Sequence, residues 1–170
     1  MPVQQDPKGA TRATVLAAIG AVLRKGANQH VLARKQHAEG DQLTHERLTI
    51  RSSVDPATLQ DAVVRGLGLP YEKPTAVHAE LFQGLVMPGH VQFCLGTRVL
   101  TVFTAGMRVE PAGTGGSTLT YGVEKWTLAD GIVGGIPHLK FLRRRIEEEA
   151  RNVDAHIDVT VDPTTEQVQR

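Results

Sequence analysis

The chain has 170 residues, 41% of them apolar, and a formal net charge of +1 at pH 7. This length and apolar content are typical of one globular domain with a buried core. No apolar run reaches the ~20 residues that a membrane-spanning helix needs, so no membrane span is predicted. The single cysteine, Cys94, excludes an internal disulfide and suits a reducing compartment. We therefore expect a cytoplasmic protein.

Residues 1–40 are predicted to form a helical N-terminal arm. They hold six basic against two acidic residues, a net charge of +4, although the whole chain is almost neutral. Thr11 is a suitable cap for a helix that ends at Lys25 before a glycine, and a second helix is expected over Asn28–Glu39, ended by Gly40. The first helix has an apolar face made of Val15, Leu16, Ile19, Val22 and Leu23. Packing of this arm on the domain or on a partner is expected.

The next segment changes from helical to alternating periodicity. Leu43–Arg51 alternates as a strand, and a short helix is expected over Ala57–Val64. Asp55 or Ser53 would cap that helix, because both are good acceptors for free amides, and Pro56 suits its first turn.

Four further segments have the alternation and turn residues of an antiparallel run of strands: Ala76–Val86, His90–Leu95, Val99–Val109 and Thr118–Leu128. The inward faces of three strands are expected to hold Val77, Ala79, Leu81, Gln83, Leu85, Val91, Phe93, Leu95, Leu119, Tyr121 and Val123. Val99–Val109 is apolar on both faces, so its phase is open; in the phase that places Val99, Phe103 and Met107 inward, Thr101 is inward as well. Gly96-Thr97 is interpreted either as a tight hairpin turn or as a bulge within one longer strand.

A long amphipathic helix is predicted from Gly135 to Ile157. Its apolar residues recur in steps of three and four: Ile136, Leu139, Leu142, Ile146, Ala150, Val153 and Ile157. Each of the three arginines at 143–145 has a glutamate four residues later, so the face is neutralised and no nucleic-acid partner is expected. Residues Asp158–Arg170 are interpreted as a short strand or a polar tail. The element order favours an α+β domain with a long helix on an antiparallel β-meander.

From Leu43 to Ile157 this order resembles the helix-grip fold of the START-like superfamily, which includes polyketide cyclases, lipid-transfer domains and the birch-pollen-allergen type. The resemblance rests on the first strand, the helix opening Val54-Asp55-Pro56-Ala57, the meander, and the last helix after Gly134-Gly135. It gives a helical arm over 1–40, a START-like domain over 41–158 and a polar tail over 159–170. The family has a second short helix, which would then lie within Gly66–Pro74, and at least six strands, where about five are expected here.

The resemblance implies binding of a hydrophobic or aromatic small molecule in a cavity between the sheet and the C-terminal helix. The corresponding ligand-binding residues would be Glu46, Leu81, Phe93, Thr101, Phe103, Tyr121, Leu139, Leu142 and Ile146. Fold alone does not distinguish a binding protein from an enzyme.

Two alternatives stay open. The first is a non-catalytic interaction or oligomerisation module with a filled core, in which the arm docks on a partner or on an identical subunit. The second is a cyclase or dehydratase that uses Tyr121 and Glu46 as an acid–base pair. No other catalytic residue is identified. The histidines form no close pair and Cys94 has no cysteine partner, so no metal site is predicted. No cofactor is expected, since the glycine-rich segments match no phosphate-binding loop.

Overall fold

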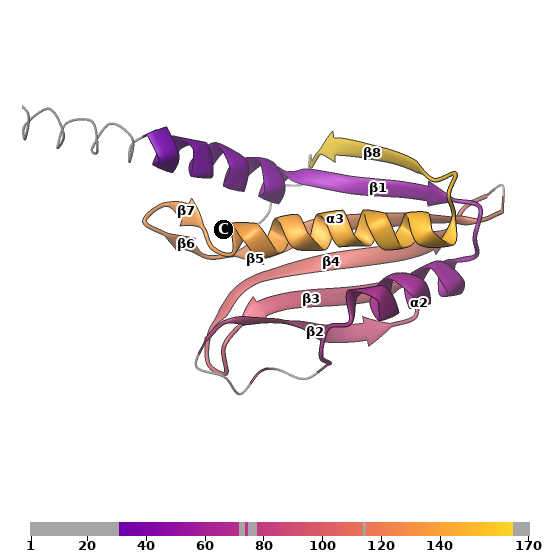
Figure 1. The fold of residues 1–170 in the computed structure, drawn as a ribbon, viewed down its shortest axis with the longest axis horizontal. Coiled ribbons are helices and arrows are strands. Elements are labelled where there is room, and N and C mark those ends of the chain that lie inside the picture. The colour runs from indigo at the N-terminus through magenta and orange to yellow at the C-terminus, as the bar shows by residue number, and fades with distance from the viewer. Residues whose placement is uncertain (1–30, 72–73, 75–77, 114, 165–170) are drawn as a thin grey trace, which may run out of the picture.

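The computed structural model describes residues 31–71, 74, 78–113 and 115–164. The expected leader and the helix over Thr11–Lys25 lie outside these residues. The described chain is an α+β structure with a six-stranded antiparallel sheet in the order β2-β3-β4-β5-β1-β8. Helices α2 and α3 lie side by side on one face of this sheet (Figure 1). The two layers confirm the predicted α+β class.

Residues 31–45 form a helix (the N-terminal helix) that leads directly into β1, Glu46–Ser52. The prediction that Gly40 ends this helix, and that the strand starts at Leu43, was wrong. A Cβ at Gly40 would lie 2.9 Å from Cγ2 of Val133, so the glycine permits close packing inside the helix. The Thr44 hydroxyl, one turn after the glycine, donates a hydrogen bond to the Gly40 carbonyl.

Helix α2, Pro56–Leu67, is longer than predicted but begins as expected. The Asp55 carboxylate accepts a hydrogen bond from the Thr58 amide at 3.0 Å, and Gly68 ends the helix with a φ of 60°. The second short helix expected within Gly66–Pro74 is absent from described residues 68–71. There the Pro70 carbonyl instead accepts a hydrogen bond from the backbone amide of Gln83, so this segment lies along the sheet edge.

The meander consists of β2 (Glu80–Met87), β3 (His90–Gly96), β4 (Thr101–Pro111) and β5 (Ser117–Trp126). The predicted inward faces of β3 and β5 are confirmed, because Val91, Phe93, Leu95, Leu119, Tyr121 and Val123 are buried. The phase of β2 was predicted wrongly beyond its middle. The β2–β3 pairing shifts register at Gly84, where a Cβ would lie 2.8 Å from the Cys94 sulfur. Gln83 is buried, as predicted, but Phe82 is buried as well and Leu85, beyond the shift, is exposed.

The connection between β3 and β4 resolves the open interpretation of Gly96-Thr97. Residues 97–100 form a turn closed by a hydrogen bond from the Thr97 amide to the Leu100 carbonyl. Val99 lies in this turn with 90% of its surface exposed, and Thr101 is also exposed, so their expected inward positions were wrong. The cause is a register shift beside Gly96, which changes the phase of β4 at its start.

Helix α3, Ile136–Val153, covers the sheet with the predicted stripe, since Ile136, Leu139, Leu142, Ile146 and Ala150 are all buried. It ends at Asp154, earlier than the expected Ile157, although Ile157 is still buried. The chain then forms β8, Asp158–Pro163, which pairs with β1 at the sheet edge. A small hairpin of β6 (Leu128–Ala129) and β7 (Ile132–Val133) precedes α3. Its Asp130-Gly131 turn has two positive φ angles.

Candidate functional site

The structure brings six of the nine predicted ligand-binding residues together in the hydrophobic core beneath α3. These six are at most 4% exposed: Phe93, Phe103, Tyr121, Leu139, Leu142 and Ile146. The other three lie elsewhere. Leu81 is half-buried beside the core, Thr101 is exposed, and Glu46 forms an ion pair at the start of β1.

These core side chains fill the space between the sheet and α3. Phe93, Leu142 and Ile146 have no exposed surface at all. A side chain that lined a water-sized cavity would retain accessible surface facing that cavity. The region where the resemblance places a ligand cavity is therefore packed with protein side chains around these three residues.

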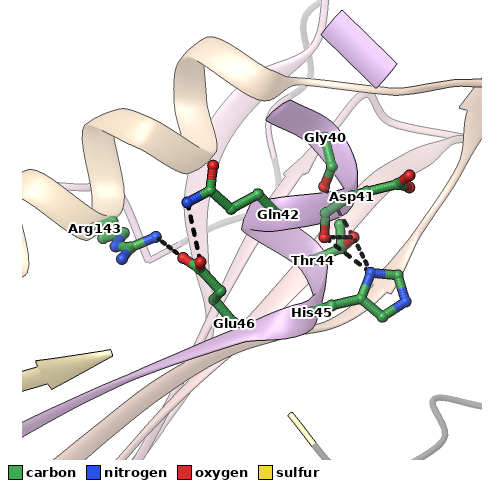
Figure 2. Close-up of polar contacts among 7 residues, drawn as sticks. All are labelled: Gly40, Asp41, Gln42, Thr44, His45, Glu46 and Arg143. Carbon is green, nitrogen blue, oxygen red and sulfur yellow. Dashed lines mark hydrogen bonds and ion pairs between the residues drawn. The ribbon is translucent and has the colours of Figure 1, made fainter. Parts of the chain in front are cut away.

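Glu46 joins three elements through its carboxylate (Figure 2). It accepts a hydrogen bond from Arg143 of α3 at 2.8 Å and one from Gln42 of the N-terminal helix at 3.0 Å. Burial raises the pKa of Glu46, but the hydrogen bonds from Arg143 and Gln42 and the charge of Arg143 outweigh it, so the pKa lies below its ordinary value. Arg143 thus pairs with Glu46 of the sheet. The sequence pattern predicted Glu147 as its partner instead.

Tyr121 has the opposite shift. Burial raises the pKa of its hydroxyl far above the ordinary value, although the charge of Arg143 acts in the other direction. The hydroxyl oxygen is buried and has no hydrogen-bond partner within the described part of the chain. A general acid–base pair needs pKa values near neutrality. The environment moves the pKa of Glu46 downward and that of Tyr121 upward, both away from this range, so the pKa shifts do not favour this pair.

The histidines do not gather into a metal site. Within the described ranges, no group of three or more His, Cys, Asp or Glu side chains is placed to hold a metal ion. His90 pairs with Met87 at one end of β2, whereas His78 precedes the other end of that strand. His78 and His90 therefore lie at opposite ends of the strand and are not neighbours.

A groove lies between the first turns of α2 and the hairpin that joins β2 to β3; we name it the α2–hairpin groove. Its volume is about 510 Å³. The lining is mainly apolar and consists of Pro56, Ala57, Gln60, Asp61, Val86, Met87, Pro88, Gly89, Val109 and Pro111. Asp61 is the one charged residue in this lining. The groove is therefore suited to an apolar occupant with a basic group at its rim.

Gln60 fixes the hairpin wall of this groove to α2. Its side-chain amide donates to the Met87 carbonyl at 2.8 Å, and its side-chain oxygen accepts from the Gly89 amide at 2.7 Å. Gly89 has a φ of 77°, which suits glycine after proline in a tight turn, and its carbonyl accepts from the Val109 amide. Three elements are thus tied together around the groove by hydrogen bonds to backbone groups.

The hairpin wall presents three consecutive apolar residues to solvent. Leu85, Val86 and Met87 are 41%, 38% and 49% exposed. Three apolar residues in a row within a strand must point to both faces, so at least one points away from the core. That run, directly before Pro88-Gly89, is the sequence signal that would have identified this surface. The predicted inward faces did not include it, because unbroken alternation through Gly84 would place Leu85 in the core.

No protein-family model, curated protein sequence or solved structure matches the chain. No helix within the described ranges is long and apolar enough to cross a membrane.

Proposed function

We propose that the chain is a non-catalytic interaction module that binds an apolar protein segment in the α2–hairpin groove. The observation that carries this proposal is the exposed pair Val86 and Met87, which lines a wall of the groove that Gln60 ties to α2 by two hydrogen bonds. Exposed apolar side chains that adjoin a groove are typical of interaction sites. The packed core beneath α3 supports the same function, because among the described residues the groove is an apolar hollow that opens to solvent, whereas the space under α3 is filled.

We further propose that the fold is a variant of the START-like helix-grip arrangement. The pairing of β5 with β1, and a helix after the meander that lies against the sheet, support this proposal. Strand β8, which follows α3 and extends the sheet beyond β1, would be an addition to that arrangement.

The groove is tested with the fluorescent apolar probe 1-anilinonaphthalene-8-sulfonate, at a protein dilution where the chain is monomeric. We expect probe emission from the unmodified protein and a severalfold loss in the Met87→Glu variant, because a carboxylate disfavours an apolar ligand. Val99→Glu is the matched control, since Val99 is 90% exposed and lies at the opposite end of β4. Equal emission from the protein and Met87→Glu would contradict the proposal.

A second candidate function is binding of a hydrophobic small molecule beneath α3. The observation that favours it is the buried Tyr121 hydroxyl, whose oxygen has no partner within the described residues. A ligand carbonyl would satisfy this donor if α3 moved outward. Native mass spectrometry of gently purified protein should then show extra mass from a bound ligand that denaturation removes. The Tyr121→Phe variant should retain less of this ligand. A bare mass for the native protein would rule against this candidate.

A further inference from the structure

We propose that the occupant of the α2–hairpin groove is residues 11–25 of a second copy of this chain, so that two copies exchange their N-terminal arms. This inference rests on the proposed function of the groove. It identifies the partner from the composition of the arm, from the charge of the groove and from the place where the arm joins the sheet.

The arm has the chemistry that the groove requires. Residues 11–25 are predicted to form a helix with an apolar stripe that begins at Val15 and ends at Leu23. The charged residues of this segment, Arg12, Arg24 and Lys25, are all basic. The groove offers apolar walls and one carboxylate, Asp61, on α2. An apolar helix with basic ends therefore complements the groove in both polarity and charge.

Residues 11–25 cannot lie along their whole length in the groove of the same chain. The N-terminal helix joins β1 at Glu46, whereas the groove lies at the Ser52 end, where Ser52 and Pro111 both pair with Ser117. Figure 1 shows the N-terminal helix extending from the sheet away from that end. Strand β1 spans about 20 Å, and the helical residues 31–45 add about 22 Å. Val31 is therefore roughly 40 Å from its own groove.

The connection between the arm and the N-terminal helix is too short to cover this distance. Six steps from Lys25 to Val31 reach at most about 21 Å when fully extended. The Lys25 end of the arm thus stays roughly 20 Å short of the groove in its own chain. A second copy has no such limit, and reciprocal exchange gives a closed two-fold dimer with both grooves filled.

Disulfide cross-linking tests the exchange in the full-length protein. One preparation carries Ile19→Cys and the other carries Met87→Cys, so a bond between these cysteines joins two chains. We expect mild oxidation of the mixture to give a cross-linked dimer, because a disulfide requires the two Cα atoms to lie within about 7 Å. The unmodified protein, whose cysteine is the buried Cys94, is one control. A mixture of Ile19→Cys and Val99→Cys is the other.

Charge reversal provides a second measurement. Sedimentation of the unmodified protein should show a monomer–dimer equilibrium, and Asp61→Lys should weaken it by roughly tenfold, the effect of losing one favourable charge contact and adding repulsion. The triple variant Asp61→Lys, Arg24→Glu, Lys25→Glu should recover most of the loss. Asp41→Lys, on the exposed N-terminal helix, is the control and should leave the equilibrium unchanged.

Three results would overturn the exchange. The first is a protein that is still a monomer at about 100 μM, where contacts of micromolar affinity are saturated. The second is cross-linking to Val99→Cys as efficient as to Met87→Cys, and the third is a dimer whose stability does not change in Asp61→Lys. The proposed function is judged separately. If the exchange fails but probe binding at high dilution still depends on Met87, the groove binds a different partner. If both fail, the groove has no binding role. If both hold, probe emission per chain should fall as protein concentration rises, because arms displace the probe.

Discussion

Asp154 is a single residue that joins the end of α3 to the sheet. Its carboxylate accepts hydrogen bonds from the Ser52 hydroxyl and the Ser53 amide and hydroxyl, at 2.8–2.9 Å, and from the His156 amide at 2.9 Å. The hydrogen bonds from Ser53 and His156 backbone amides, with those from the two serine hydroxyls, lower the pKa of Asp154 well below its ordinary value. The ionised form therefore stabilises the folded state.

This shift predicts a pH dependence. A carboxyl whose pKa is lower in the folded state stabilises the protein above its unfolded pKa of about 3.9 and loses that contribution as the pH falls through the folded value. Asp154→Asn should lower Tm at pH 7 by a few degrees, roughly, and should flatten the fall in Tm below pH 4. Differential scanning calorimetry measures both effects. Asp162→Asn, on exposed β8, serves as the control; an equal loss from that variant would contradict a specific role for Asp154.

Residues differ in how far the sequence reveals their partners. The Asp55 cap was predictable because its partner, Thr58, is three residues away in the chain. Asp154 was predicted to lie within the helix. Its role at the end of α3 was not predictable, because its main hydrogen-bond partners, Ser52 and Ser53, lie about a hundred residues earlier in the chain. Gln60 was missed for the same reason. A hydrogen bond between distant segments leaves no periodic pattern in a single sequence.

At the scale of elements, the β2–β3 hairpin depends on a side chain of α2. Gln60 is 7% exposed and satisfies one donor and one acceptor of the turn. Gln60→Leu should destabilise the protein by about 1–3 kcal/mol, since it leaves the Met87 carbonyl and the Gly89 amide without partners. Urea unfolding measures this loss, and hydrogen exchange should speed up at Gly89.

A second variant separates the hydrogen bonds from packing. Gln60→Glu keeps an acceptor for the Gly89 amide but sets a buried carboxylate oxygen against the Met87 carbonyl, so at pH 7 its loss of stability should be at least that of the leucine variant. Protonation of the glutamate at low pH restores a donor and should recover part of that loss. If Gln60→Leu were as stable as the unmodified protein, the turn would be held by Gly89 and Val109 alone.

Element boundaries were predicted less well than the elements themselves. Gly40 and Gly84 have the sequence appearance of a helix terminator and an ordinary strand residue. In the structure, Gly40 lies inside a helix against Val133, and Gly84 marks the register shift of β2. Both outcomes depend on which side chain approaches the glycine from another element. Only the folded arrangement supplies that information.

At the scale of the whole molecule, the α+β class and most of the element order followed from periodicity. The stripe on α3 and the alternation of β3 and β5 are strong signals because one face of each element is buried. The position of the candidate site was not predictable in the same way. Most of the predicted ligand-binding residues are core residues, since an apolar inward face has the same pattern whether it fills the interior or surrounds a cavity. The groove arises where α2 and the hairpin approach each other.

The place of β1 in the sheet has a consequence for synthesis on the ribosome. Although β1 is the first strand of the described residues to be made, its two neighbours, β5 and β8, begin only at Ser117 and Asp158. At about 5–20 residues per second, the emerging strand waits roughly 5 to 20 s for both partners. Throughout that interval its apolar residues, Leu48 and Ile50, face a growing chain that is not yet able to enclose them. The nascent polypeptide is therefore most vulnerable to misassociation before β8 leaves the exit tunnel.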